Sequence, residues 1–337
     1  MAVVKGNAYG HGAVPVTQAA LAAGATWCGV ARVEEALELR KAGFDCPILL
    51  LGFSAPGRYD ELVANHISLT VWDPEQMHLA KQAAARQGRR AQLHIKVNTG
   101  MNRLGVSPEE TPWLASLIDE QEELQLEGIF THFARADEIE AESSDLQEKR
   151  FKGILETLQD QKRLPPVVHA ANSAAALTRP GAYFTLVRAG IAMYGLQPSS
   201  QRALPQAFQP ALAWKAVLSQ VKLVPSGSGI SYGHVYCTKK IERIGTVPVG
   251  YVDGFRRILG SQVLVGGKCV PFVGRVCMDQ LMVQLDTVPE ARMGDEVVMI
   301  GRQNEACQTA EELGRMWGTI NYEVTACIAA RVPRIYP

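Results

Sequence analysis

Residues 93–132 read LHIKVNTGMNRLGVSPEETPWLASLIDEQEELQLEGIFTH and contain one complete unit of a repeating pattern. The short apolar runs at 93–98 and 126–132 have the length and composition of buried strands. The stretch between them, 108–123, contains five Glu and two Leu, residues that favour helices. A strand, a helix and a second strand in this order predict a βαβ unit with parallel strands.

The same alternation extends from the amino end to about residue 200. The runs expected to be strands are 2–5, 27–31, 47–52, 68–72, 93–98, 126–132, 167–171 and 185–191. Helix-like stretches include 33–42, 74–87, 108–123 and 146–161. Eight strands with intervening helices predict a (β/α)8 barrel of the TIM type, in the α/β class.

The pattern changes after Gly195, because residues 197–208 are rich in Pro, Ser and Gln. Beyond them, β-branched residues gather at 213–224, 244–249, 262–265, 282–285 and 296–300, with one helix-like stretch at 309–317. We therefore expect two domains: a barrel over 1–205 and a mostly β domain over 206–337.

Composition limits the partners. The chain has 34 basic and 34 acidic residues, so it lacks the one-sided positive field that nucleic acid or an anionic membrane requires. Its longest apolar runs, such as 47–52 and 167–176, are too short to cross a bilayer, and no secretion signal is apparent. Seven cysteines without a CxxC pair and histidines without metal spacing predict no disulfide framework and no metal. These features favour a cytoplasmic protein that acts on a small molecule.

The start of the chain is unusual for a barrel. Met1 lies only a few residues before the end of the first expected strand, and no helix-length pattern follows the eighth. Apolar strand faces left uncovered there would cost roughly 25 cal/mol per Å². We therefore expect the barrel to lack an N-terminal helix and Met1 to be an internal methionine of a longer natural chain.

Polar residues at the carboxyl ends of barrel strands are candidates for function, because barrel active sites form there. They are Lys5, Lys96, Arg103, His132, Asn172, Ser173 and Arg188. Position alone does not distinguish Lys5 from a snorkelling lysine. Its surroundings, VKGNAYGHG at 4–12, combine small residues that admit a bulky ligand with hydrogen-bonding groups at Asn7, Tyr9 and His11.

VKGNAYGHG resembles the lysine motif of alanine racemases that holds pyridoxal 5'-phosphate (PLP), with Gly6 where that family usually has Ala. The resemblance continues in the family's order through HIKVNTGMNRLG, THFARAD, HAANSAA, VRAGIAMYGL, SGISYGHVY, VGYVDGFRR, GRVCMDQ and INYEV. It implies an isomerase that interconverts L-alanine and D-alanine, with D-alanine as a peptidoglycan precursor.

The resemblance also implies how the cofactor is held. Lys5 would carry PLP, and Arg188 would contact its pyridine nitrogen, with His132 beside it. Residues that resemble the family's phosphate and cofactor ligands are Tyr9, Asn172, Ser173, Gly190, Ile191 and Tyr322. A guanidinium is always protonated, so Arg188 would disfavour protonation of the ring nitrogen and limit transamination.

Racemisation needs an acid/base on each face of the substrate. By resemblance these groups are Lys5 and Tyr232, with His132 as the helper of Tyr232, and they meet across a homodimer interface. Arg103 and the backbone of Met278 would bind the substrate carboxylate. Lys96 resembles a lysine that is carbamylated in many family members. Residues similar to those of the family's entrance corridor are Asp137, Tyr251, Arg257, Arg275 and Ile320.

Other functions remain open at this stage. One alternative is a broad-specificity amino-acid racemase, because one or two corridor residues could change the pocket size. A decarboxylase of the same architecture usually pairs its ring nitrogen with an acidic residue, which Arg188 disfavours. A non-catalytic PLP-binding protein has no need of Tyr232, and a short chain could also be a defective enzyme that still binds PLP.

Overall fold

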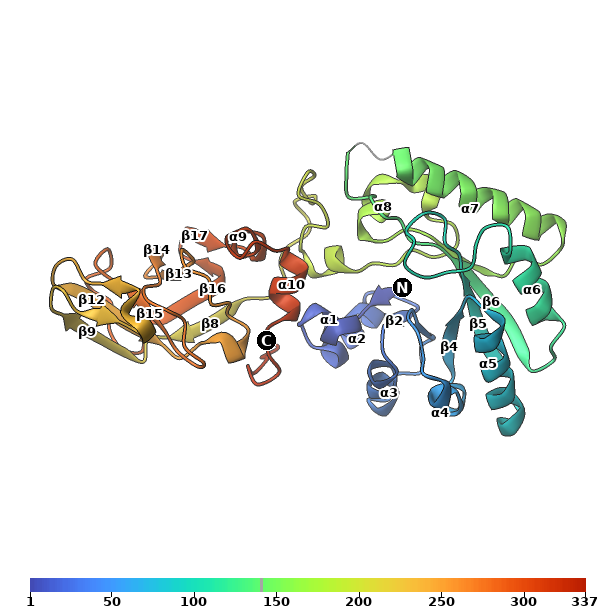
Figure 1. Cartoon of the computed structure of the whole chain (residues 1–337), viewed down its shortest axis with the longest axis horizontal. Coiled ribbons are helices and arrows are strands. Elements are labelled where there is room, and N and C mark those ends of the chain that lie inside the picture. Colours follow the sequence, from blue (N-terminus) through green and yellow to red (C-terminus); the bar gives the residue numbers. More distant parts are fainter. Residues whose placement is uncertain (140–141) are drawn as a thin grey trace. The chain divides into compact units, whose positions relative to one another are not determined.

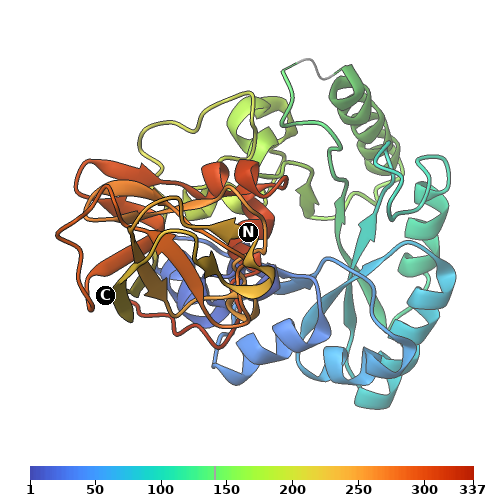
Figure 2. The same cartoon turned by 60° about the vertical axis from the view of Figure 1, so that its left-hand side comes forward.

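The computed structural model describes residues 1–139 and 142–337, which form two compact units. One unit, here called the barrel unit, contains 1–8, 12–193 and 197–206. The other, the β unit, contains 9–11, 194–196 and 207–337. Figures 1 and 2 show the chain coloured along its sequence. Each unit is described by itself below.

Seven short parallel strands form the sheet of the barrel unit and pair in sequence order. They are β1 (Ala2–Val3), β2 (Cys28–Val30), β3 (Ile48–Leu50), β4 (Ile67–Val71), β5 (Ala91–Lys96), β6 (Leu124–Phe130) and β7 (Val167–His169). Figure 2 shows helices around the outside of these strands. They are α2 (Ala13–Ala22), α3 (Val33–Lys41), α4 (Tyr59–Ala64), α5 (Pro74–Gln87), α6 (Thr111–Asp119), α7 (Glu142–Asp160) and α8 (Ser173–Thr178). The predicted TIM-type barrel is confirmed.

The eighth expected strand, 185–191, is not a continuous strand. Ala189 alone forms a parallel bridge, with Ala2 of β1. On the β7 side, the backbone of Leu186 donates to Val168 O and that of Arg188 to Ala171 O and not Ala170 O, so the pairing is displaced by one residue. The carbonyl of Ala170 accepts from the side chain of Arg188 instead. The segment therefore bonds to both β7 and β1 without regular strand pairing.

Several element ends differ from those expected. Lys5 and His132 lie just beyond β1 and β6 and not within them. Helix α6 is shorter than the predicted 108–123, and α7 begins at Glu142, four residues before the predicted 146. Residues 140 and 141, which precede α7, lie outside the described part of the chain.

A left-handed turn follows β1. The element α1 (Lys5–Tyr9) contains four consecutive residues with positive φ: Gly6 at 63°, Asn7 at 52°, Ala8 at 53° and Tyr9 at 54°. Left-handed backbone costs an L-residue with a Cβ roughly 1–2 kcal/mol, whereas glycine adopts it freely. Gly6, where the family usually has Ala, therefore lowers the strain of the turn beside Lys5.

The β unit is mostly β, as predicted. One sheet has the order β15–β12–β9, with β9 (Gln220–Val224), β12 (Glu242–Val247) and β15 (Leu281–Gln284). The other contains β8 (Trp214–Val217), β13 (Gln262–Val265), β14 (Lys268–Pro271), β16 (Glu296–Gln303) and β17 (Ala306–Gln308). The predicted strand 213–224 is thus two strands in different sheets. A short hairpin joins β10 (Gly229–Ile230) to β11 (Tyr236–Cys237).

Two short helices, α9 (Ala310–Met316) and α10 (Asn321–Ala326), follow the strands of the β unit. The sequence predicted the first, whose amino end is capped by the side chain of Thr309. Across the two described stretches of the chain, no helix has the length and apolarity needed to cross a membrane.

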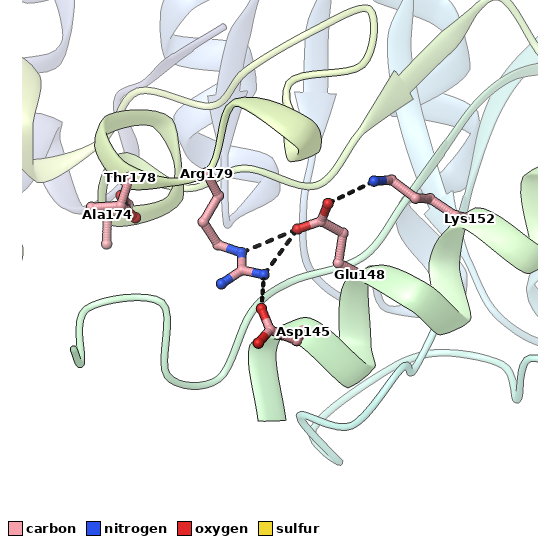
Figure 3. A network of polar contacts seen from close by, with 6 residues as sticks. All are labelled: Asp145, Glu148, Lys152, Ala174, Thr178 and Arg179. Carbon is pink, nitrogen blue, oxygen red and sulfur yellow. Dashed lines mark hydrogen bonds and ion pairs between the residues drawn. The ribbon is translucent and has the colours of Figure 1, made fainter. Parts of the chain in front are cut away.

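An ionic network ties the segment after α8 to α7 (Figure 3). The guanidinium of Arg179 bonds to the carboxylate of Asp145 and to that of Glu148, with Nη2 3.0 Å from Glu148 Oε2. Lys152 Nζ donates to the other oxygen of Glu148 at 2.7 Å. The side chains of Arg179 and Glu148 are only 18% and 14% exposed, so water screens this pair less than a surface pair.

Arg179→Met should therefore destabilise the barrel unit by about 1–2 kcal/mol, between the values for exposed and buried pairs. This corresponds to a Tm lower by about 2–8 °C in a unit of this size. Arg86→Met is the matched control, because Arg86 makes a two-pronged pair with Asp60 in which both side chains are more than half exposed. Its Tm should fall by less than about 2 °C. Equal shifts of Tm in the two variants would contradict the assigned role of burial.

Candidate active site

Arg188 is the most buried charge among the predicted site residues of the barrel unit, at 3% exposure. Its Nη1 donates to His169 Nδ1 at 2.9 Å. Its Nη2 donates to Thr131 O at 2.8 Å and Ala170 O at 2.9 Å, and lies 3.2 Å from His132 Nδ1. These acceptors engage both N–H groups of Nη2 and one of Nη1, so within residues 1–139 and 142–337 the Nε–H and the second Nη1–H are the guanidinium donors without a protein hydrogen bond.

Aromatic stacking supports the same guanidinium. The ring of Phe130 stacks on that of His169, with centroids 4.7 Å apart, and the Cζ of Arg188 lies 5.4 Å from the Phe130 centroid. Burial lowers the pKa of Arg188 to about 9, which still leaves it charged at neutral pH. The barrel unit therefore presents a fixed cation that can only donate hydrogen bonds.

His132 is kept neutral by its surroundings. Burial, followed by the charge of Arg188 and the nearby cations Lys96, Arg103 and Lys5, holds its pKa well below the ordinary value. A guanidinium cannot accept, so His132 Nδ1 must accept from Arg188, and the single ring proton must be on Nε2. His132 therefore offers an Nε2–H donor.

Lys5 occupies the start of the left-handed turn. Burial, and then the charges of Arg103 and Arg188, lower the pKa of its amine, while Glu35 opposes the shift. The carboxylate of Glu35 also accepts from the backbone of Gly6 at 2.6 Å and from that of Ala31 at 2.8 Å. It thereby ties the turn to the start of α3. The amine is placed among cations that favour its neutral, nucleophilic form.

Lys96 ends β5 and is 6% exposed. Burial, and then the charges of Arg188 and Arg103, lower its pKa to about 7. Its Nζ donates to Val97 O at 3.0 Å and lies 5.3 Å from the centroid of Phe130. The side chain is thus partly neutral near pH 7.

Ser173, the first residue of α8, accepts hydrogen bonds from two backbone N–H groups. Its Oγ accepts from Gly190 N at 2.9 Å and from Ala192 N at 3.3 Å. The Oδ1 of Asn172 caps α8 by accepting from Ala175 N at 3.0 Å. Ile191 is buried and begins the short helix η3 (Ile191–Tyr194). The N–H groups of Gly190 and Ala192 thus donate to Ser173 Oγ, and the Ser173 hydroxyl keeps its own proton, which it can donate to an anion.

Tyrosines form a cluster in the β unit. The ring of Tyr9 lies 5.1 Å from that of Tyr194 and 6.0 Å from that of Tyr322, which is on α10. Burial raises the pKa of Tyr9 to about 12, so its phenol stays a donor. Gly10 is needed here, because a Cβ would lie 2.0 Å from Thr325 O.

Tyr232 is 68% exposed and begins η4 (Tyr232–His234). It lines a cavity of about 860 Å³ together with Ser231, His234 and Met282. Met278 is 57% exposed, and its backbone oxygen accepts from Val252 N, beside Tyr251. Both side chains are therefore open to solvent in the β unit.

The predicted corridor residues are spread over both units. Arg257 and Arg275 line a second cavity of the β unit, of about 370 Å³. Ile320 and Tyr251 are also exposed residues of the β unit. Asp137 belongs to the barrel unit, where its side chain is exposed and its carbonyl accepts from Ser199 Oγ.

Several residues of these sites were not predicted from the sequence. They are Glu35, His94, Glu127, His169 and Tyr194. His169 is the first residue of HAANSAA, and His94 lies two residues before Lys96 on the same strand, so it shares a face with Lys96. Both signals were available, but buried histidines in apolar runs resemble core residues. In the described residues, no three His, Cys, Asp or Glu side chains are grouped as metal ligands.

Comparisons with known proteins agree with this description. Residues 1–198 match the family model for the alanine racemase N-terminal domain, and residues 211–336 match that for the C-terminal domain. The chain is 44% identical to the alanine racemase of Symbiobacterium thermophilum over 100% of this chain and 90% of that protein. It is 45% identical to that of Desulforamulus reducens over 100% of this chain and 91% of the relative.

A solved structure of alanine racemase from Bacillus anthracis with bound L-Ala-P is also similar. It is 44% identical, has a TM-score of 0.93, and the match covers 98% of this chain and 86% of that one. Two family models that together span nearly the whole sequence, and full-length relatives above 40% identity, confirm the predicted resemblance. The chain belongs to the alanine racemase family.

Proposed function

We propose that this chain interconverts L-alanine and D-alanine with PLP as its cofactor. The observation that carries the proposal is the group of cations in the barrel unit, in which Lys5 and Lys96 each lie within electrostatic range of both Arg103 and the buried Arg188. Such a group is costly to assemble unless anions bind to it. A phosphorylated cofactor and an amino-acid carboxylate supply those anions.

The donors in the structure fit PLP. The hydroxyl of Ser173 with the amides of Gly190 and Ile191, and the phenols of Tyr9 and Tyr322, would hold the phosphate, beside Asn172. The free Nε–H of Arg188 suits the pyridine nitrogen, and the amine of Lys5 suits covalent attachment. When bound, PLP supplies an electron sink that stabilises negative charge at the substrate Cα.

Arg188 would set how strong that sink is. The guanidinium would donate to the ring nitrogen of PLP and would not protonate it, so the electron sink that PLP supplies would be weaker. This favours racemisation over transamination.

Two groups would move the Cα proton on opposite faces of the substrate. Lys5, whose pKa is lowered by burial and neighbouring cations, serves one face. Tyr232 of a second copy serves the other. The Nε2–H of the neutral His132 is the donor that would stabilise the phenolate of that tyrosine.

A homodimer is therefore part of the proposal. The barrel domain at 1–205 would hold PLP, and the β domain at 206–337 would supply Tyr232 and Met278 to the partner's site. Tyr232 and Met278 are 68% and 57% exposed in the single chain, so both are accessible to a second copy.

Recognition of the substrate carboxylate would fall to Arg103, with the backbone N–H of Met278 as a second donor. A carbamate on Lys96 would replace a repelling charge near Arg103 with an anion that accepts from it. The partly neutral Lys96 amine supports this modification, because CO2 reacts with the neutral form.

Tyr251, Asp137, Arg257, Arg275 and Ile320 would line the entrance and limit side-chain size. The alternative is a racemase of broad specificity on the same site. Measuring kcat/KM for alanine, serine and lysine separates the two functions. If the entrance is restrictive, kcat/KM for alanine should exceed that for a larger amino acid by at least about tenfold for each additional side-chain group.

The central test uses two inactive variants. Lys5→Ala and Tyr232→Phe should each abolish formation of D-alanine from L-alanine with added PLP, since each removes one base. Mixing them under conditions of subunit exchange should restore partial activity, because a hybrid dimer contains one intact site. A matched tyrosine control, Tyr236→Phe, should leave racemisation within about twofold. No recovery despite proven subunit exchange would refute the shared site, and full activity of Lys5→Ala would refute the function.

Carbamylation of Lys96 should depend on pH. Because the pKa of Lys96 is about 7, its neutral amine is the major form at pH 8 and the minor form at pH 6. Carbon-13 NMR with labelled bicarbonate should show a carbamate signal at pH 8 that decreases towards pH 6. The signal should vanish in Lys96→Ala and persist in Lys152→Ala, which removes an exposed lysine. No carbamate at pH 8 would contradict the modification.

A further inference from the structure

A buried chain of hydrogen bonds extends from Arg188 away from the reacting groups. Arg188 Nη1 bonds to His169 Nδ1 at 2.9 Å, His169 Nε2 to His94 Nδ1 at 3.1 Å, and His94 Nε2 to Glu127 Oε2 at 3.1 Å. Both imidazoles are fully buried. No step of the proposed mechanism uses His94 or Glu127.

The direction of every hydrogen bond in this chain follows from its ends. A guanidinium only donates, so His169 Nδ1 accepts and its proton is on Nε2. His169 Nε2–H then donates to His94 Nδ1, which places the proton of His94 on Nε2, facing Glu127. A carboxylate only accepts, so it completes the chain. Both rings are neutral, since burial is the largest cause lowering their pKa values.

A bulge in strand β6 allows this series of hydrogen bonds to form. The pairing of β5 with β6 shifts register between Leu93 and His94, which pair with Leu126 and Gly128, so Glu127 is an extra residue in a bulge. Bulges redirect a side chain and are common beside active sites. Gly128 makes room for His94, because a Cβ there would lie 2.3 Å from its ring. Ser68 of β4 donates to the same Glu127 oxygen at 2.5 Å.

We propose that Glu127 and His94 are positioning residues for Arg188. They fix the tautomer of His169 so that it accepts from the guanidinium, which holds the Nε–H of Arg188 on the ring nitrogen of the cofactor. If the side chain at 127 could donate, the direction of the hydrogen bonds through His94 and His169 could reverse. His169 Nδ1 would then carry a proton and face an N–H of Arg188, so two donors would oppose each other. The proposal rests on the role given to Arg188 under the proposed function.

The first test is the tautomers themselves. Long-range 15N–1H NMR of the purified enzyme with 15N-labelled histidine should show His94 and His169 neutral with the proton on Nε2, assigned by His94→Gln and His169→Gln. A proton on Nδ1 of His169 would overturn the proposal. This measurement does not depend on turnover, so it can fail or succeed independently of the proposed function.

The second test is Glu127→Gln, whose amide can donate. We expect kcat for racemisation to fall about tenfold, as for the loss of an outer-layer partner, with KM for alanine within about twofold. Pyruvate formed by transamination should increase relative to D-alanine, a ratio that a loss of stability alone does not change. The control, Glu122→Gln, alters an exposed carboxylate near the same strand and should leave all three quantities unchanged.

Gly128→Ala supplies an independent variant, because it displaces His94 without changing any ionisable group. It should reproduce the lower kcat and higher transamination ratio, whereas Gly153→Ala, at a helix position with open space, should not. Unchanged kcat and ratio in the folded variants, Glu127→Gln and Gly128→Ala, would refute the positioning role. If the unaltered enzyme forms no D-alanine, the proposed function fails instead, and the tautomer result still tests the chain of hydrogen bonds.

Discussion

The burial of the Arg188 guanidinium is the constraint on which the rest of the site depends. At 3% exposure the charge has lost its hydration, and in the described residues no carboxylate bonds to it directly. Two backbone carbonyls, two imidazoles and the face of Phe130 replace water. A buried charge must be satisfied in this way or it destabilises the fold. The acceptors therefore had to be placed around it by β6, β7 and the segment that follows them.

Several properties of neighbouring groups follow from that charge. It contributes to the lowered pKa of Lys5, Lys96 and His132, so it favours the neutral forms of both amines and of the imidazole. A neutral amine can attack a carbonyl or remove a proton, and a neutral imidazole with a defined tautomer can donate to a phenolate. Under the proposed function, one buried guanidinium would thus prepare bases on both sides of the substrate. It also makes the site attractive to anions.

Much of the barrel fold could be predicted from the sequence, because apolar runs and helix-forming segments alternate regularly up to residue 200. The eighth strand could not, since its apolar pattern gives no sign that the carbonyl of Ala170 is taken by the side chain of Arg188. Motifs identified Lys5, Arg188 and His132, which the structure places together. Glu127 escaped detection because a bulge redirects its side chain, and a bulge leaves no clear signal in a single sequence. The left-handed turn after β1 was likewise hidden, although Gly6 and Asn7 are residues that tolerate it.

The account as a whole depends on Arg188 donating to the ring nitrogen of PLP and leaving it unprotonated. The direct measurement is the 15N NMR chemical shift of PLP labelled at that nitrogen and bound to the enzyme near pH 7. The buried, charged guanidinium predicts the shift of an unprotonated pyridine nitrogen that accepts a hydrogen bond, and Arg188→Glu should move it towards the pyridinium value. A pyridinium shift in the unaltered enzyme would contradict the account.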